Sequence, residues 1–120
     1  MAKILIADDS AAIRLVLKDI LLIGEHELVA EASDGAEAVV LYQQHNPQIL
    51  LLDLAMPKKD GLTVVKEIMD YDPNAKIILI TASDDQKIIA ECLKIGAKFH
   101  ISKPFDFNSV LKSITELLEN

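Results

Sequence analysis

Three acidic residues stand directly after apolar segments of the sequence, where a charged side chain is costly. Asp8 and Asp9 follow the segment KILIA, and Asp53 follows QILLL. Carboxylates that lie close together repel one another unless a cation neutralises them. Mg²⁺ suits this role, because it prefers oxygen ligands and is usually held by one or two carboxylates together with a phosphate oxygen. Asp8 or Asp9, together with Asp53, therefore predicts a magnesium site that is open to a phosphoryl group.

A threonine and a lysine at two further apolar segments extend this set toward phosphoryl transfer. Thr81 ends the segment AKIILIT, and Lys103 follows KFHIS. The lysine supplies a positive point charge and the threonine a hydroxyl donor, both of which suit the equatorial oxygens of a phosphoryl group in transfer. Asp53 is the candidate nucleophile, because a carboxylate can form an acyl phosphate.

The elements that must position these groups alternate along the chain. The expected strands are short and rich in Ile, Leu and Val, as in a buried parallel sheet: 3–7, 27–32, 48–53, 75–81 and 98–102. A helical pattern follows each strand, over residues 13–21, 35–45, 62–71, 84–95 and 107–118. Ser10, Asp34 and Asp84 are the candidate N-caps. Five βα units are too few for an eight-stranded barrel, so we predict an α/β fold with an open, doubly wound parallel sheet.

This architecture brings the five candidate side chains to one place. In an open parallel sheet, ligands bind beyond the carboxyl ends of the strands, where the strand order reverses. Each of the five residues stands at that end of a predicted strand. We therefore expect them to share one crevice.

Composition limits the classes of partner. The chain has 120 residues, of which 51% are hydrophobic and 26% charged, and we expect one domain over 1–120. A formal charge of −7 disfavours nucleic acid as a partner, because binding to its backbone relies on clustered Lys and Arg. One cysteine, no signal-peptide pattern and no apolar stretch of about 20 residues predict a cytoplasmic protein that is not bound to a membrane.

Four motifs together resemble the CheY-type receiver domain, the phosphoacceptor module of two-component signalling. They are ADDS at 7–10, LLLDLAMP at 50–57, ITAS at 80–83 and SKPF at 102–105. The resemblance covers essentially the whole chain and implies a flavodoxin-like (βα)₅ sheet with strand order 2-1-3-4-5. It also implies a stand-alone response regulator that is a signalling module rather than an enzyme, with magnesium-dependent self-phosphorylation and self-dephosphorylation.

The resemblance assigns the acids and one carbonyl group to the chemistry. Asp53 would accept a phosphoryl group from the histidine of a kinase or phosphotransfer protein. Asp8, Asp9, Asp53 and the backbone carbonyl of Ala55 would bind Mg²⁺, or Mn²⁺ in its place. Ala55 and Ser83 match variable family positions that flank the phosphate, and both are small here.

Lys103 and Thr81 match the lysine and the hydroxyl that contact the phosphate in the family, and the Lys103–Pro104 bond is expected to be cis. The family usually has Tyr or Phe three residues before the lysine, as a ring that moves inward when the hydroxyl is drawn to the phosphate. Here His100 holds that position. Because imidazole is smaller, polar and titratable near neutral pH, we expect the switch formed by Thr81 and His100 to be weaker, pH-sensitive or absent.

The signal is expected to leave through a downstream protein, because no output domain is predicted. The resemblance implies docking around Ile95, Lys98, His100 and Phe107, on a surface whose conformational equilibrium is biased by phosphorylation. We expect a monomer whose downstream target is a motor, a phosphorelay protein or an enzyme.

Other functional classes fit the sequence less well. A nucleotide-binding enzyme needs a glycine-rich loop after the first strand, and ADDSAAIR has no glycine. An FMN carrier would need Ser, Thr and Gly where Asp8 and Asp9 stand, and a haloacid-dehalogenase-type phosphatase needs an acid at Ala55. The remaining alternative is a degenerate receiver that interacts with proteins independently of phosphorylation, with Asp53 and Lys103 as a structural ion pair.

Overall fold

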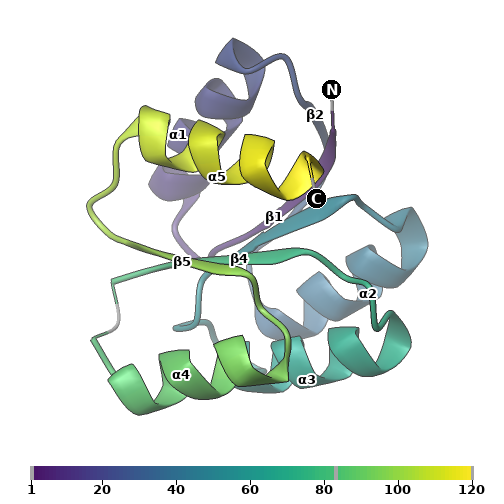
Figure 1. The fold of residues 1–120 in the computed structure, drawn as a ribbon. Coiled ribbons are helices and arrows are strands. Elements are labelled where there is room, and N and C mark those ends of the chain that lie inside the picture. The colour runs from purple at the N-terminus through teal and green to yellow at the C-terminus, as the bar shows by residue number, and fades with distance from the viewer. Residues whose placement is uncertain (1, 83, 120) are drawn as a thin grey trace.

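A parallel five-stranded sheet lies at the centre of the molecule, with helices on both faces (Figure 1). The computed structural model describes residues 2–82 and 84–119. The strands are β1 (Lys3–Ala7), β2 (Glu27–Ala32), β3 (Ile49–Leu52), β4 (Ile77–Thr81) and β5 (Phe99–Ser102). The helices are α1 (Ala11–Ile23), α2 (Gly35–His45), α3 (Gly61–Tyr71), α4 (Gln86–Ile95) and α5 (Phe107–Leu118). The strand order is β2-β1-β3-β4-β5, so the predicted fold and order are confirmed.

The continuous apolar runs of the central strands supply two separate cores. Side chains alternate between the faces of a strand, so neighbouring residues point to opposite sides of the sheet. Leu5, Leu50 and Leu79 pack with α2, α3 and α4, whereas Ile6, Leu51 and Ile80 pack with α1 and α5. Burial on both faces explains why these strands show no polar alternation.

Most helix starts follow the expected capping chemistry. The side chains of Ser10 and Asp34 accept hydrogen bonds from backbone N–H groups of α1 and α2, as predicted. The prediction of Asp84 for α4 is wrong, because Asp85 is the residue whose carboxylate accepts from Lys87 and Ile88 N–H. Adjacent aspartates have the same capping ability, so composition alone does not choose between them.

The strand boundaries differ slightly from the expected ones at three strands. β3, β4 and β5 are each shorter than predicted, with residues 48, 53, 75, 76 and 98 outside the ladder. As a result Asp53 lies just beyond the last residue of β3. Its side chain belongs to neither hydrophobic core and lies at the carboxyl end of the sheet.

Candidate functional site

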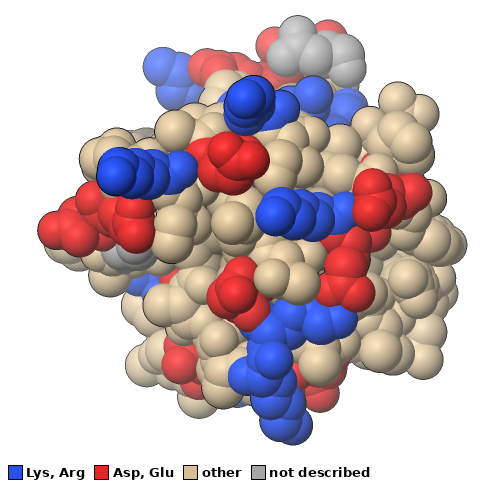
Figure 2. Space-filling model, turned by 90° about the horizontal axis from the view of Figure 1, so that it is seen from below, with Lys and Arg blue, Asp and Glu red and all other residues tan. Residues whose placement is uncertain are grey.

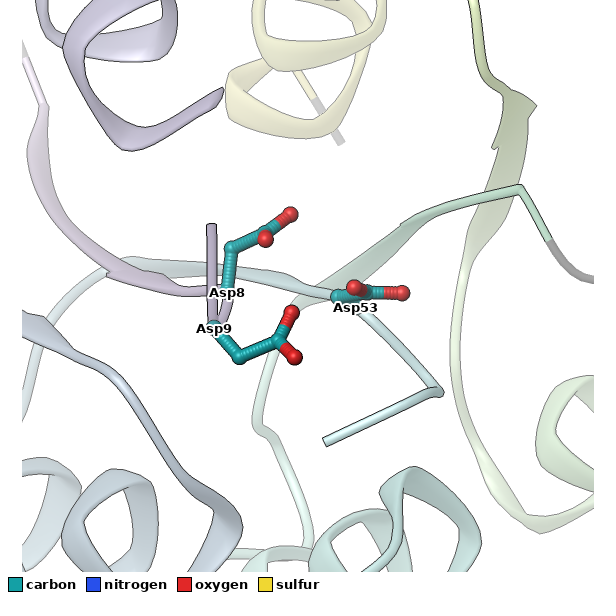
Figure 3. Close-up of side chains that lie close together, drawn as sticks. All are labelled: Asp8, Asp9 and Asp53. Carbon is teal, nitrogen blue, oxygen red and sulfur yellow. The ribbon is translucent and has the colours of Figure 1, made fainter. Parts of the chain in front are cut away.

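The three predicted acids lie together at the carboxyl ends of β1 and β3, which are neighbouring strands (Figure 3). One carboxylate oxygen from each of Asp8, Asp9 and Asp53 lies within 4.8 Å of the others. Asp8 and Asp53 are buried, at 1% and 5% exposure, whereas Asp9 is exposed. The cluster is therefore closed on the side of the protein and open to solvent at Asp9.

Backbone hydrogen bonds extend the sheet just far enough to fix the two buried acids. Asp53 N–H donates to the Ala7 carbonyl at 2.9 Å, and Asp8 N–H donates to the Ala32 carbonyl at 3.0 Å. The carboxylates are also held: Asp8 Oδ1 accepts from Ser10 N–H at 2.9 Å, and Asp53 Oδ1 accepts from Ala55 N–H at 3.2 Å. These bonds leave the second oxygen of each carboxylate directed toward other groups.

Lys103 supplies the positive charge that meets those second oxygens. Its Nζ donates to Asp8 Oδ2 at 2.7 Å and to Asp53 Oδ2 at 3.3 Å. Burial acts to lower the pKa of Lys103, but the hydrogen bond to Asp8 and the charge of Asp53 outweigh it and raise the pKa overall. The lysine therefore remains an ammonium group at neutral pH.

The donor set fits a small divalent cation. Three carboxylates, of which Asp8 and Asp53 are buried and Asp9 is exposed, outnumber the one ammonium, and the ligand atoms on offer are all oxygens. Hard oxygen ligands with part of the shell left to solvent suit Mg²⁺, and Mn²⁺ shares this preference. Asp8, Asp9 and Asp53 are the residues that could hold the ion, while ligation by the Ala55 carbonyl stays a prediction.

Comparison with known proteins assigns the chain to a family. A family model described as the response regulator receiver domain matches residues 4–115. The chain belongs to this family. The chemotaxis protein CheY of Bacillus subtilis is 42% identical over 116 residues, covering 97% of each chain, and CheY of Thermotoga maritima is 41% identical over 115 residues, covering 96% of each.

Solved structures agree with this assignment. A chain in the CheX–CheY–BeF₃–Mg²⁺ complex from Borrelia burgdorferi is 37% identical, with a TM-score of 0.92 and coverage of 97% of this chain and 88% of that one. A CheY-like receiver domain from Methanospirillum hungatei has a TM-score of 0.93 at 25% identity, covering 99% of this chain and 94% of the other. The CheY-like fold of this receiver domain is thereby shown.

Thr81 and Lys103 lie on adjacent strands of the receiver domain. Thr81 is fully buried at the end of β4, opposite Ser102 of β5, and its carbonyl accepts from Lys103 N–H at 3.0 Å. The Lys103–Pro104 peptide bond is cis, as expected. Contact of the Thr81 hydroxyl with a phosphoryl group stays a prediction, and the predicted role of Ser83 lies outside the described residues.

His100 occupies the position at which the family usually carries an aromatic ring. It pairs with Leu79 in the parallel register, so its side chain lies on the sheet face covered by α2, α3 and α4. Its Nε2 atom is buried and has no hydrogen-bond partner among the residues that the structure describes. A buried nitrogen without a hydrogen-bond partner is costly, so His100 places an unsatisfied polar atom at the position of the expected switch.

The loop after Asp53 is shaped by two close approaches that only glycine permits. A Cβ at Gly35 would meet the Lys59 carbonyl, and a Cβ at Gly61 would meet the backbone of Leu54. Gly35 N–H also donates to the Pro57 carbonyl at 3.3 Å. The start of α2 is therefore in direct contact with the loop that carries Ala55.

Sequence reasoning missed a second charged cluster close to the acids. Arg14 donates to the backbone carbonyl of Asp8 at 2.7 Å and to Glu31 Oε1 at 2.8 Å, and Lys18 donates to Glu31 Oε2 at 2.9 Å. One signal could have found it. A cation in the first turn of a helix opposes the helix dipole, so Arg14 needs a reason to be there.

Charge on the outer surface is mixed where it can be seen. On the face that α3 and α4 cover, basic and acidic side chains are interspersed (Figure 2).

Across the described residues, no helix combines the length and apolar character needed to cross a bilayer. The cytoplasmic location stays a prediction.

Proposed function

We propose that this receiver domain accepts a phosphoryl group on Asp53 from a phosphohistidine of a kinase or phosphotransfer protein. The observation that carries the proposal is the meeting of Asp8, Asp9 and Asp53 within 4.8 Å, with Lys103 bridging two of them. Family membership supports a signalling role, since receiver domains are modules of two-component systems. The chain acts as a phosphoacceptor rather than as an enzyme with a separate substrate.

A carboxylate oxygen of Asp53 attacks phosphorus in the transfer. The O–P bond forms as the P–N bond to the partner's histidine breaks, and the imidazole departs with the electron pair. A bound Mg²⁺ ion supplies positive charge to the transferred oxygens and offsets the repulsion between them and the carboxylates. Asp8 and Asp9 would hold the ion beside Asp53, where its charge would reach the transferred oxygens.

Lys103 is suited to contact the transferred group without leaving its present position. An ammonium group has three N–H donors, and two are directed to Asp8 and Asp53. The third can donate to an oxygen of the phosphoryl group once that group is bound to Asp53. Thr81 donates its hydroxyl to another of these oxygens, which draws the end of β4 toward the site.

The phosphorylated chain signals through its surface at α4, β5 and α5. Ile95 and His100 are half-buried there, and Lys98 and Phe107 are exposed, Phe107 at 49%. Movement of Thr81 changes the space beside β5, which biases this surface toward a form that binds a downstream protein. With His100 in place of a larger ring, the bias is weaker or depends on pH.

Phosphorylation is tested with acetyl phosphate and Mg²⁺. Mass spectrometry should find one added phosphoryl group that is labile in base and absent from Asp53→Asn. Asp70→Asn, at an exposed aspartate of α3, is the matched control and should be modified like the parent. An unmodified parent would favour the alternative function, a degenerate receiver that binds its partners independently of phosphorylation.

Output is tested with beryllofluoride, which mimics the phosphoryl group. A partner should be retained on the parent only when the mimic and Mg²⁺ are present. Retention should be lost in Lys98→Glu, which changes the docking surface and leaves the acids intact. Equal retention without the mimic would contradict signalling by phosphorylation.

A further inference from the structure

Arg14 connects the acid pair at the end of β1 to the neighbouring strand β2. Its Nη1 donates to the Asp8 carbonyl at 2.7 Å, and its Nε donates to Glu31 Oε1 at 2.8 Å. The side chain of Arg14 is only 17% exposed. The guanidinium is therefore clamped between a backbone carbonyl on one side and a carboxylate on the other.

Glu31 is held from two directions. Its second oxygen accepts from Lys18 Nζ at 2.9 Å, one helical turn beyond Arg14 on α1. Hydrogen bonds from Lys18 and Arg14 lower the pKa of Glu31, so the carboxylate stays ionised at neutral pH. Arg14 is the member of this cluster that also touches the acid pair.

Local helix stability does not account for an arginine at this position. Arg14 is the fourth residue of α1, where the positive end of the helix dipole disfavours a cation. A partly exposed ion pair with Glu31 gives back little stability in compensation. The hydrogen bond to the Asp8 carbonyl is the interaction that remains to favour the guanidinium at this position.

That carbonyl belongs to the peptide group that joins Asp8 to Asp9. The peptide unit is planar, so the direction of its oxygen fixes the direction from which the chain enters Asp9. Asp8 N–H is bound to Ala32, and Asp8 Oδ1 accepts from Ser10 N–H. The bond from Arg14 completes this set by fixing the joining peptide itself.

We propose that Arg14 is a positioning residue of the metal site, which orients Asp9 relative to Asp8 by holding the peptide between them. Glu31 in turn orients the guanidinium. The proposal rests on the proposed function in that the site binds Mg²⁺, and it predicts that cation affinity depends on a residue whose own charge repels the cation.

The test compares Arg14→Ala with Lys18→Ala by calorimetric titration with Mg²⁺. Each variant removes a cation of α1 that is hydrogen-bonded to Glu31, but only Arg14 also contacts Asp8. Arg14→Ala should weaken Mg²⁺ binding about tenfold, as the loss of outer contacts does in other metal sites. Lys18→Ala should bind Mg²⁺ as tightly as the parent or slightly more tightly.

The sign of the effect separates positioning from electrostatics. Loss of a nearby positive charge would by itself strengthen cation binding, so weaker binding requires displaced ligands. Arg14→Lys keeps the charge but has one ammonium in place of the fork, and it should also bind Mg²⁺ less tightly. Unchanged or tighter binding in both Arg14 variants would overturn the proposal.

Amide hydrogen exchange of the metal-free chain gives a readout that does not depend on Mg²⁺. Exchange at Asp9 and Ser10 should be faster in the Arg14 variants than in the parent, and unchanged in Lys18→Ala. Equal exchange in all four proteins would overturn the positioning role. A parent that binds no Mg²⁺ while its Arg14 variants exchange faster would instead count against the proposed function alone.

Discussion

Two charged clusters lie side by side near the start of α1, and they are built on opposite principles. The acidic site, formed by Asp8, Asp9, Asp53 and Lys103, is largely buried and carries an excess of negative charge. The Glu31 cluster, formed by Arg14, Lys18 and Glu31, gives one carboxylate two cations, and its glutamate side chain is 34% exposed. Uncompensated charge is thus found where burial makes it most costly.

This difference teaches which of the two clusters serves stability. A half-exposed carboxylate with two cationic partners is stabilising in the folded state, if only modestly. Buried carboxylates that outnumber their partners oppose folding, because desolvation and mutual repulsion both act against them. The proposed binding of a cation and a phosphoryl group would explain why the acidic site keeps this arrangement at some cost in stability.

The largest expected effect comes from removing the one ammonium of the acidic site. Lys103→Met leaves Asp8 and Asp53 buried without it, and it should lower the free energy of unfolding by about 3 kcal/mol. Lys18→Met in the Glu31 cluster should cost less than about 1 kcal/mol. Denaturant unfolding without metal measures both values, and a cost for Lys103→Met no greater than that for Lys18→Met would contradict the comparison.

Added Mg²⁺ sharpens the same experiment. It should restore more stability to Lys103→Met than it adds to the parent, because the cation takes over the neutralising role of the lysine. The Lys18→Met variant should respond to Mg²⁺ like the parent. An equal response in all three proteins would indicate that the ion binds elsewhere.

A smaller effect should have opposite signs in the two clusters. Asp9→Asn removes a repelling charge and should raise the free energy of unfolding without metal by about 0.5–1 kcal/mol. Glu31→Gln removes the partner of Arg14 and Lys18 and should lower it by about 1 kcal/mol, a value already reduced for solvent screening. If both changes destabilise the metal-free chain, the acidic site is not strained by its own charge.

The smallest effect is the pH dependence of the Glu31 cluster. Hydrogen bonds from Lys18 and Arg14 lower the pKa of Glu31. The contribution of the Glu31 carboxylate to the free energy of unfolding is therefore fully present above pH 4.5, the ordinary pKa of a glutamate. The contribution is lost as the pH falls below 4.5 through the lowered pKa of the folded state. The difference in unfolding free energy between the parent and Glu31→Gln should therefore shrink on acidification, and a difference that stays constant or grows would contradict the assignment.

The sequence was sufficient for the sheet and for the meeting of the candidate residues. Apolar runs with a charged or hydroxyl residue at the end predicted the strands, and the rule for parallel sheets then placed Asp8, Asp53 and Lys103 at one edge. These inferences succeed because burial on both sheet faces leaves a strong compositional mark. The family resemblance added the strand order, which the pattern of residues did not determine.

Contacts between distant side chains were beyond the sequence. Arg14 and Glu31 belong to different elements, and although a cation in the first turn of a helix is unusual, the sequence does not indicate which acid it pairs with. Likewise, Ile88 and Leu93 of α4 are exposed at 38% and 40%, although both are apolar. Only Ile89 and Cys92 of α4 are buried, because the helix contacts the rest of the protein along a narrow strip.

Titration calorimetry with Mg²⁺ on the parent and on Asp53→Asn tests the central claim most directly. The account predicts saturable binding of one ion by the parent and markedly weaker binding by Asp53→Asn, in a chain that remains folded. Absence of binding heat in the parent across buffers of different ionisation enthalpy, or equal affinity in the two proteins, would contradict a cation site built on these three acids.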